Sequence, residues 1–341
     1  MMSRKDIAIF GPYPPPLGGI SVHVKRMEPF LKKKGLSYVI YNHGSASNTN
    51  VVATHKRPLW YVKLFFTPRA RLFHFHQFFY FHFPFYFLFS LFRKERIFVT
   101  IHSERLLSYG HTKKKVALFF LSKIKNLTLI SVSKNLKTYL DSKNIKSLFL
   151  PAYVPPISDK VKNLDIGENY FLFSVWKFTR TLAHEIYNVP LAFEFLRDNR
   201  HDLKMLFMIG NKKDSDTKYL ETLIDQFDVR DKIELCFNEN LVDYLTNCRF
   251  LLRPNLSDGY GVSVQEAMDM GAPAIASDVC ARPQGSVLFK SDNINSLNEQ
   301  VAFVLNTPIS DILDKREELG FHLDLLDAYI HTINETSNTK L

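Results

Sequence analysis

The chain has 341 residues, of which 46% are hydrophobic and 23% charged, so it can bury large cores and is expected to form two domains. Lys and Arg total 44 against 34 Asp and Glu, a net charge of +10, and the positive charge is concentrated in residues 1–165. Three cysteines without paired spacing exclude a disulfide framework and a cysteine zinc site, and they fit the reducing cytoplasm.

The first half of the chain alternates predicted strands and helices after a start that carries no apolar leader sequence, which predicts an intracellular protein. Short apolar runs predict strands, and amphipathic spacing predicts helices, at the following positions: strands 7–10, 36–42, 96–102, 127–133 and 147–152, and helices 20–34 and 113–124. Nearly continuous apolar strands that alternate with helices predict a parallel sheet covered on both faces.

Residues 72–92 form an aromatic segment without Asp, Glu, Lys or Arg. Phe73 and Phe75 alternate with His74 and His76, which predicts a strand at its start and a structural role for both histidines. Its polar residues disfavour a membrane span, although about 20 residues are long enough for one. Basic residues on both sides are typical of contact with an anionic membrane surface, and a buried aromatic core is the open alternative.

Residues 153–169 are rich in Pro and charge, which predicts a linker between domains. A second alternating series follows, with strands at 170–176, 203–210, 232–237, 249–254 and 273–277, and helices at 216–227, 240–248 and 263–270. The prediction is an α/β protein of two doubly wound, Rossmann-like domains facing a cleft. The expected domains are 1–160 and 161–310, with a helical tail 311–341 that returns to the first domain.

Two loops of the first domain are candidates for ligand binding, because ligands of parallel sheets bind beyond the carboxyl ends of strands. Gly18 and Gly19 precede a helix whose amino end favours an anion or a sugar hydroxyl, although a plain Pro/Gly turn is the alternative. His102 ends a strand, where it can bind a hydroxyl or phosphate or be a satisfied structural histidine. The glycine spacing does not match a dinucleotide fingerprint.

Two loops of the second domain are also candidates. Lys177 and Arg180 follow its first strand and are candidates for a diphosphate, with a solvated basic loop as the alternative. The strongest signal is SDGYGVSVQE, residues 257–266, in which Asp258 and Glu266 flank a glycine-containing loop and the start of a helix. Glu266 can accept two hydrogen bonds from a ribose diol. The loop and helix amides that can point at a ligand belong to Gly259, Gly261, Val262 and Ser263.

The segment SDGYGVSVQEAMDMGAPAIASD resembles the signature of retaining glycosyltransferases of family 4, which have the GT-B fold. The resemblance extends to GPYPPPLGGISVH, TIHSE, SVSKNLKTYL and LPAYVPP, and it is strongest to bacterial enzymes of polysaccharide assembly. It implies transfer of a sugar from a nucleotide-diphosphate sugar to a glycan or lipid-linked acceptor, with retention of configuration. It also implies a cytoplasmic enzyme, peripheral on the inner face of the plasma membrane.

The resemblance implies roles for individual residues. Glu266 would hold the ribose, Asp258 the sugar hydroxyls, and the amides from Tyr260 to Ser263 the sugar and diphosphate. Gly19 would face the diphosphate, and His102 would lie beside the transferred sugar. Two departures are an Asp at 258, where the family usually has Glu, and SVWKFTR, where it usually has GR followed by KG. Lys177 and Arg180 are substitutes there, and Arg282 is a further candidate phosphate ligand.

Two other functions remain open on the sequence. A nucleotide-sugar epimerase of the same fold would use one nucleotide sugar, but it should have more acidic residues in the first domain. A nucleic-acid binder fits the basic first half, yet no motif supports it. No His/Cys cluster indicates a metal site, and neither a metal nor a cofactor is expected beyond the donor sugar itself.

Overall fold

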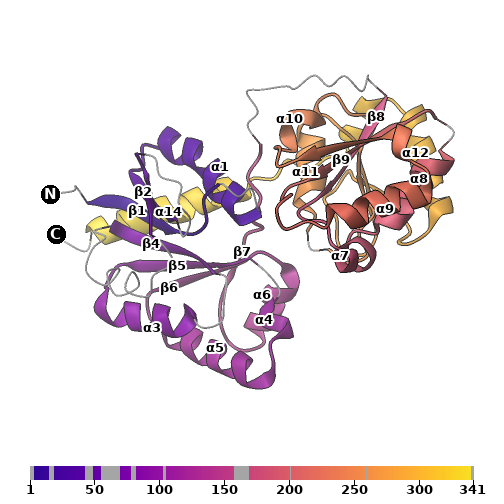
Figure 1. The fold of residues 1–341 in the computed structure, drawn as a ribbon. Helices are drawn as coiled ribbons and strands as arrows, with labels where there is room; N and C mark the ends of the chain where they lie inside the picture. The colour runs from indigo at the N-terminus through magenta and orange to yellow at the C-terminus, as the bar shows by residue number, and fades with distance from the viewer. Residues whose placement is uncertain are drawn as a thin grey trace. The chain divides into compact units, whose positions relative to one another are not determined.

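The computed structural model describes residues 4–14, 19–42, 49–54, 70–77, 82–102, 105–156, 169–199, 201–258 and 260–338. The chain forms two compact units (Figure 1). The first unit consists of Met1–Val154 together with Gly320–Leu341, and the second unit is Pro155–Leu319.

The first unit is built on a seven-stranded parallel sheet with the strand order β3-β2-β1-β4-β5-β6-β7. Its strands are β1 (Lys5–Phe10), β2 (Tyr38–Asn42), β3 (Val51–Ala53), β4 (Ala70–Gln77), β5 (Arg96–Ile101), β6 (Leu127–Ser131) and β7 (Leu148–Phe149). Its helices are α1 (Gly19–Lys33), α3 (His82–Phe92), α4 (Arg105–Ser108), α5 (His111–Lys123), α6 (Lys134–Asp141) and α14 (Phe321–Asn338).

Apolar side chains cover both faces of this sheet. On one face, α1 and α14 pack in a core that includes Leu72, Phe98 and Tyr329. On the other face, α3 and α5 lie side by side over a core that includes Phe73 and Phe75 (Figure 1). The helix α14 thus returns to the first unit, as predicted for the tail, because its apolar stripe completes the cover of this sheet. The shorter α13 (Ile309–Leu313) belongs to the second unit.

The aromatic segment divides into a strand and a helix. Its start forms β4, which confirms the strand predicted from the alternation of Phe and His. In α3, Phe83, Tyr86 and Phe89 are buried in the core, whereas Leu91 and Phe92 are 63% and 72% exposed. In the part of the chain that the structure describes, no helix has the length and hydropathy needed to cross a bilayer.

The second unit contains a six-stranded parallel sheet with the order β10-β9-β8-β11-β12-β13. Its strands are β8 (Tyr170–Val175), β9 (Lys204–Ile209), β10 (Ile233–Phe237), β11 (Leu251–Arg253), β12 (Ala274–Ser277) and β13 (Val287–Phe289). Its main helices are α7 (Arg180–Glu185), α8 (Val189–Asp198), α9 (Thr217–Phe227), α10 (Val242–Leu245), α11 (Val262–Asp269) and α12 (Ile294–Asn306). Both faces of this sheet carry apolar cores, as expected for buried parallel strands.

Candidate active site

The strongest candidate site lies at the carboxyl ends of the central strands of the second unit. β8 pairs with β9 on one side and with β11 on the other, so the strand order reverses between β8 and β11. Ligands of open α/β sheets bind at such a switch point. Lys177 follows β8, Asp258 follows β11, and Glu266 lies on the helix after that loop. The fold therefore brings three predicted site residues to adjacent strand ends.

Asp258 is held by two arginines. Arg253, the last residue of β11, places its Nε 2.7 Å from Oδ2 and its Nη2 2.9 Å from Oδ1 of Asp258. Nη1 of Arg282 lies 2.6 Å from the same Oδ2. Burial alone would raise the pKa of Asp258, but the hydrogen bonds and charges of the two guanidiniums outweigh it and hold that pKa well below its usual range. Asp258 is therefore ionised at any physiological pH.

Arg282 occupies a different position from the one expected of a phosphate ligand. Its side chain is only 1% exposed. Besides the bond to Asp258, its Nε donates to the Ser277 carbonyl and its Nη2 to the Ser277 hydroxyl. Every nitrogen of this guanidinium thus has a protein partner, and the side chain ties the end of β12 to the loop after β11. In this arrangement Arg282 fixes the position of the Asp258 carboxylate.

Gly261 begins the turn into α11, and both its backbone conformation and its surroundings require a glycine. Its φ is +74°, in the left-handed region, and a Cβ at this position would lie 2.8 Å from Nη1 of Arg282. The turn places Val262 and Ser263 in the first turn of α11, where backbone N–H groups have no partner within the helix. The Ser263 hydroxyl accepts a hydrogen bond from Nη1 of Arg253 at 3.2 Å.

Glu266 lies one turn into α11 and is only 7% exposed. It therefore lies beside the switch point, where ligands of open α/β sheets bind. Tyr260 is half-buried and directly precedes Gly261 in the turn into α11. Gly259, also a candidate, lies outside the described residues, as does Gly18.

The two basic residues after β8 differ in their surroundings. The exposed Arg180 begins α7, with its guanidinium stacked 4.5 Å from the ring centroid of Tyr219 on α9. Lys177 is half-buried, and it forms no ion pair with any residue that the structure describes. Arg180 likewise has no ion pair among the described residues, so the two differ in burial and in the stacking of Arg180 on Tyr219.

The first unit places the remaining candidates at the carboxyl edge of its own sheet. Gly19 begins α1, and a Cβ there would meet open space. His102 follows β5, and its Nε2 lies 2.6 Å from Nδ1 of His76. His74, two residues before His76 on β4, hydrogen-bonds to the Thr100 and Tyr329 hydroxyls, which agrees with the structural role predicted for it.

Sequence reasoning missed Arg253 and the partnership of His76 with His102. A signal for Arg253 was present, because an arginine that ends the apolar run RFLLRP stands at a strand end, where side chains meet ligands.

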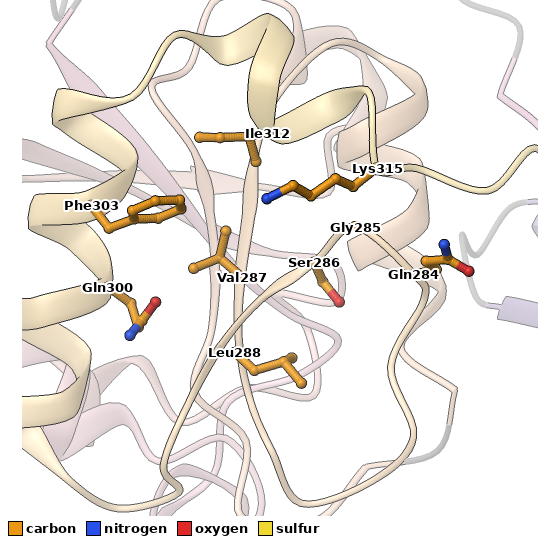
Figure 2. A pocket seen from close by; sticks show the side chains of 9 residues that line it. All are labelled: Gln284, Gly285, Ser286, Val287, Leu288, Gln300, Phe303, Ile312 and Lys315. Carbon is orange, nitrogen blue, oxygen red and sulfur yellow. The ribbon is translucent and has the colours of Figure 1, made fainter.

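Sequence reasoning also missed a pocket of about 420 Å³ at the amino end of β13, opposite the carboxyl ends where the candidate site lies (Figure 2). Figure 2 shows the Phe303 ring and the Lys315 amine turned toward Val287. This pocket is separate from the candidate site.

Across the described ranges of both units, no group of three or more His, Cys, Asp or Glu side chains is arranged to hold a metal ion. Two parallel α/β sheets, with the carboxylates at the switch point of the second, define the GT-B class of fold.

Comparison with known proteins agrees with this class. Residues 160–320 match the model of a family described as Glycosyl transferases group 1, which corresponds closely to the second unit. A sequence search of curated proteins found no match. The family match indicates a glycosyltransferase.

Solved structures with the same fold cover nearly the whole chain. Sucrose-phosphate synthase from Thermosynechococcus elongatus aligns with a TM-score of 0.74 at 14% identity, over 97% of this chain and 100% of the other. HepE from Anabaena, in complex with UDP and glucose, aligns with a TM-score of 0.71 at 10% identity, over 95% and 99%. The lipopolysaccharide outer core galactosyltransferase WaaB aligns with a TM-score of 0.62 at 12% identity, over 98% and 100%. These likenesses establish the GT-B fold.

Proposed function

We propose that the protein transfers a sugar from a nucleotide-diphosphate sugar to a glycan or lipid-linked glycan acceptor, with retention of configuration, in cell-surface polysaccharide biosynthesis. One observation carries the proposal. The segment that matches the glycosyltransferase family contains a buried carboxylate, Glu266, one turn into a helix that starts at the switch point of a parallel sheet. A carboxylate there can accept two hydrogen bonds from a ribose diol, the role that an acidic residue has in dinucleotide sites.

The charges around this position suit a diphosphate leaving group. As the anomeric bond breaks, negative charge grows on the diphosphate, and the site must stabilise it. Arg253 and Arg282 together exceed the charge of Asp258 by one positive unit. The amino end of α11 adds partial positive charge, and Lys177 lies at the neighbouring strand end with no ion-pair partner among the described residues. These groups would stabilise the leaving group without a divalent ion.

Asp258 would act on the sugar. A carboxylate oxygen has two lone pairs, so it can accept a hydrogen bond from a sugar hydroxyl beside one from an arginine. The two arginines would fix the carboxylate before the donor arrives, which lowers the entropy cost of orienting it. The family that this segment resembles usually has Glu at this position. The fixed position of the carboxylate would then compensate for the shorter side chain of Asp.

A ligand screen tests the proposal directly. The nucleotides in the HepE complexes make UDP-sugars the first donors to try, followed by GDP- and CMP-sugars. A donor at 100 times its dissociation constant should stabilise the fold by about 2.7 kcal/mol, which a thermal-shift measurement detects. Release of nucleotide on adding acceptor, with the anomeric configuration retained by NMR, is the expected chemistry. Conversion of the sugar without any acceptor would instead indicate an epimerase.

We further propose that the enzyme works at an anionic membrane surface. Five large apolar side chains are exposed on the neighbouring helices α3 and α5: Leu88, Leu91, Phe92, Val116 and Phe119, here called the α3–α5 patch. Spacings of three and four residues put Leu88, Leu91 and Phe92 on one face of α3. Lys115, Phe119 and Lys123 are four residues apart on α5, so basic and apolar groups share a stripe. This combination suits binding to anionic lipid headgroups.

A further inference from the structure

Two histidines on neighbouring strands of the first unit form one hydrogen-bonded pair. Nδ1 of His76, near the end of β4, lies 2.6 Å from Nε2 of His102, just after β5. The two rings are stacked with centroids 4.9 Å apart. His76 is buried, with 4% of its surface exposed, whereas His102 is half-buried and reaches the carboxyl edge of the sheet.

Neighbouring groups hold the His76 ring from several sides. His23 of α1 packs edge-on against both rings, at 5.5 Å from His76 and 5.6 Å from His102. His74 lies 4.3 Å away, centroid to centroid. Gly11, directly after β1, has no side chain, and a Cβ there would lie 3.1 Å from Cδ2 of His76. The ring therefore has little freedom to rotate.

Both imidazoles of the pair are neutral at physiological pH. Burial, followed by the neighbouring histidines, holds the pKa of His76 and the pKa of His102 well below the usual value of 6.5. A neutral imidazole has one N–H and one acceptor nitrogen. The hydrogen bond between the rings contains one proton, so the tautomer of His76 dictates that of His102. If His76 donates, Nδ1 of His102 carries a proton, and if His102 donates, its Nδ1 is an acceptor.

We propose that His76 is a positioning residue that fixes both the orientation and the tautomer of His102. Nδ1 of His102 is then preset either to donate to or to accept from a ligand hydroxyl. The catalytic consequence rests on the proposed function, in which His102 lies beside the transferred sugar. The pairing itself does not depend on that function.

Ring-nitrogen NMR of protein labelled with ¹⁵N-histidine tests the pairing without substrate. In the wild type, His102 should show two well-separated ¹⁵N shifts, the pattern of a single tautomer. In His76→Phe, which keeps an aromatic ring for stacking, the two shifts should converge toward an average. His111→Phe, at an exposed position at the start of α5, is the matched control and should leave His102 unchanged.

Two further variants keep the test decisive if His76→Phe folds poorly. His76→Asn places an amide where Nδ1 was and should retain a single His102 tautomer. Gly11→Ala presses on the His76 ring without removing a polar group and should shift the His102 resonances, whereas Gly110→Ala, whose Cβ meets open space, should not. Unchanged His102 shifts in both His76→Phe and Gly11→Ala would overturn the proposal.

Kinetics then test the consequence for catalysis. We expect His76→Phe to lower kcat by about 10- to 100-fold, as when a partner that orients a metal-bound histidine is removed, with little change in KM for the donor. His76→Asn should restore part of kcat. A loss of kcat without any change of the His102 tautomer would contradict the positioning role. A wild-type protein that turns over no donor would contradict the proposed function instead, and the NMR result would still decide on the pairing.

Discussion

Gly261 lies so close to Arg282 that a Cβ on this glycine would come within 2.8 Å of Nη1 of the guanidinium. That guanidinium in turn bonds to Asp258, so the backbone of the turn and the position of the carboxylate depend on each other. Any side chain at 261 would displace one of them.

We therefore predict that Gly261→Ala impairs both stability and activity. The positive φ of +74° costs an alanine about 1 kcal/mol or more, and displacement of Arg282 adds to that loss. Gly35→Ala is the matched control, because its φ of +69° is similar but its Cβ meets open space. Urea unfolding should show a larger loss for Gly261→Ala. Equal losses in both variants would contradict the contact with Arg282.

We predict that Glu266→Ala strongly weakens donor binding while the protein stays folded. Loss of a charged acceptor for the ribose diol costs about 1.5–3 kcal/mol, or roughly 10- to 150-fold in affinity. Glu299→Ala, on the exposed face of α12 in the same unit, should bind the donor normally. Calorimetric titration of both variants is the measurement, and wild-type affinity in Glu266→Ala would refute the ribose assignment.

We predict that Asp258→Asn is much more destabilising than Asp198→Asn. Both carboxylates pair with arginine at 2.7 Å, but Asp198 is 54% exposed and Asp258 only 11%. Neutralising the buried partner leaves two uncompensated guanidiniums, at a cost of about 3 kcal/mol, whereas an exposed pair contributes about 1 kcal/mol or less. In enzyme that remains folded, kcat should fall more than donor affinity. Similar unfolding free energies for the two variants would argue against the buried cluster.

The lowered pKa of Asp258 also predicts how stability depends on pH. An aspartate in the unfolded chain titrates near pH 3.9, above the folded pKa, so the unfolded state binds the proton more readily. The ion pairs therefore stabilise the fold fully above about pH 5, and this stabilisation is lost as the pH falls through the unfolded pKa toward the folded pKa. Wild type should lose more stability than Asp258→Asn between pH 5 and 3, and parallel losses would contradict this coupling.

We predict that sugar transfer does not need a divalent ion, since helix and side-chain cations are available for the diphosphate. Turnover should be unchanged in EDTA. Complete loss, restored by Mn²⁺ or Mg²⁺, would show that a metal site exists. Thermal unfolding with and without EDTA controls for an ion that only stabilises the fold.

The α3–α5 patch predicts salt-sensitive binding to anionic vesicles and none to neutral ones. Lys113→Glu with Lys115→Glu should weaken co-sedimentation, and so should Leu91→Ser with Phe92→Ser. Leu288→Ser with Phe303→Ser replaces similarly exposed apolar residues of the second unit and should have no effect. If all variants sediment like the wild type, or the wild type binds no vesicle, the membrane proposal fails.

Much of the fold was predictable because the longer strands are nearly continuous apolar runs. The strand β4 was predictable from alternation alone, with Phe73 and Phe75 facing one core and His74 the other side. The strands β3 and β13 were not predicted, since three residues each carry too little periodicity. The sequence could not decide which aromatic side chains are core, because that depends on which face of α3 meets α5: Phe83 and Phe89 are buried, whereas Phe92 is exposed.

The candidate site was predictable where it is local in sequence and not where it depends on strand order. Asp258 and Glu266 share one loop and helix, so their spacing was informative. The bond of Asp258 to Arg282, and that of His76 to His102, each join residues more than 20 positions apart. Those pairs form because β11 lies beside β12 and β4 beside β5. A single sequence does not contain that adjacency.

The return of α14 to the first unit has a consequence for biosynthesis. During translation, residues 155–319 emerge from the ribosome before α14. The second unit can therefore fold from its whole sequence while the first unit still lacks one helix. Until α14 emerges, α1 alone covers the sheet face that carries Leu72 and Phe98, and the part of that face that packs against α14 stays uncovered. The first unit is therefore begun first and completed last, and its uncovered face is the surface on which a nascent chain would engage a chaperone.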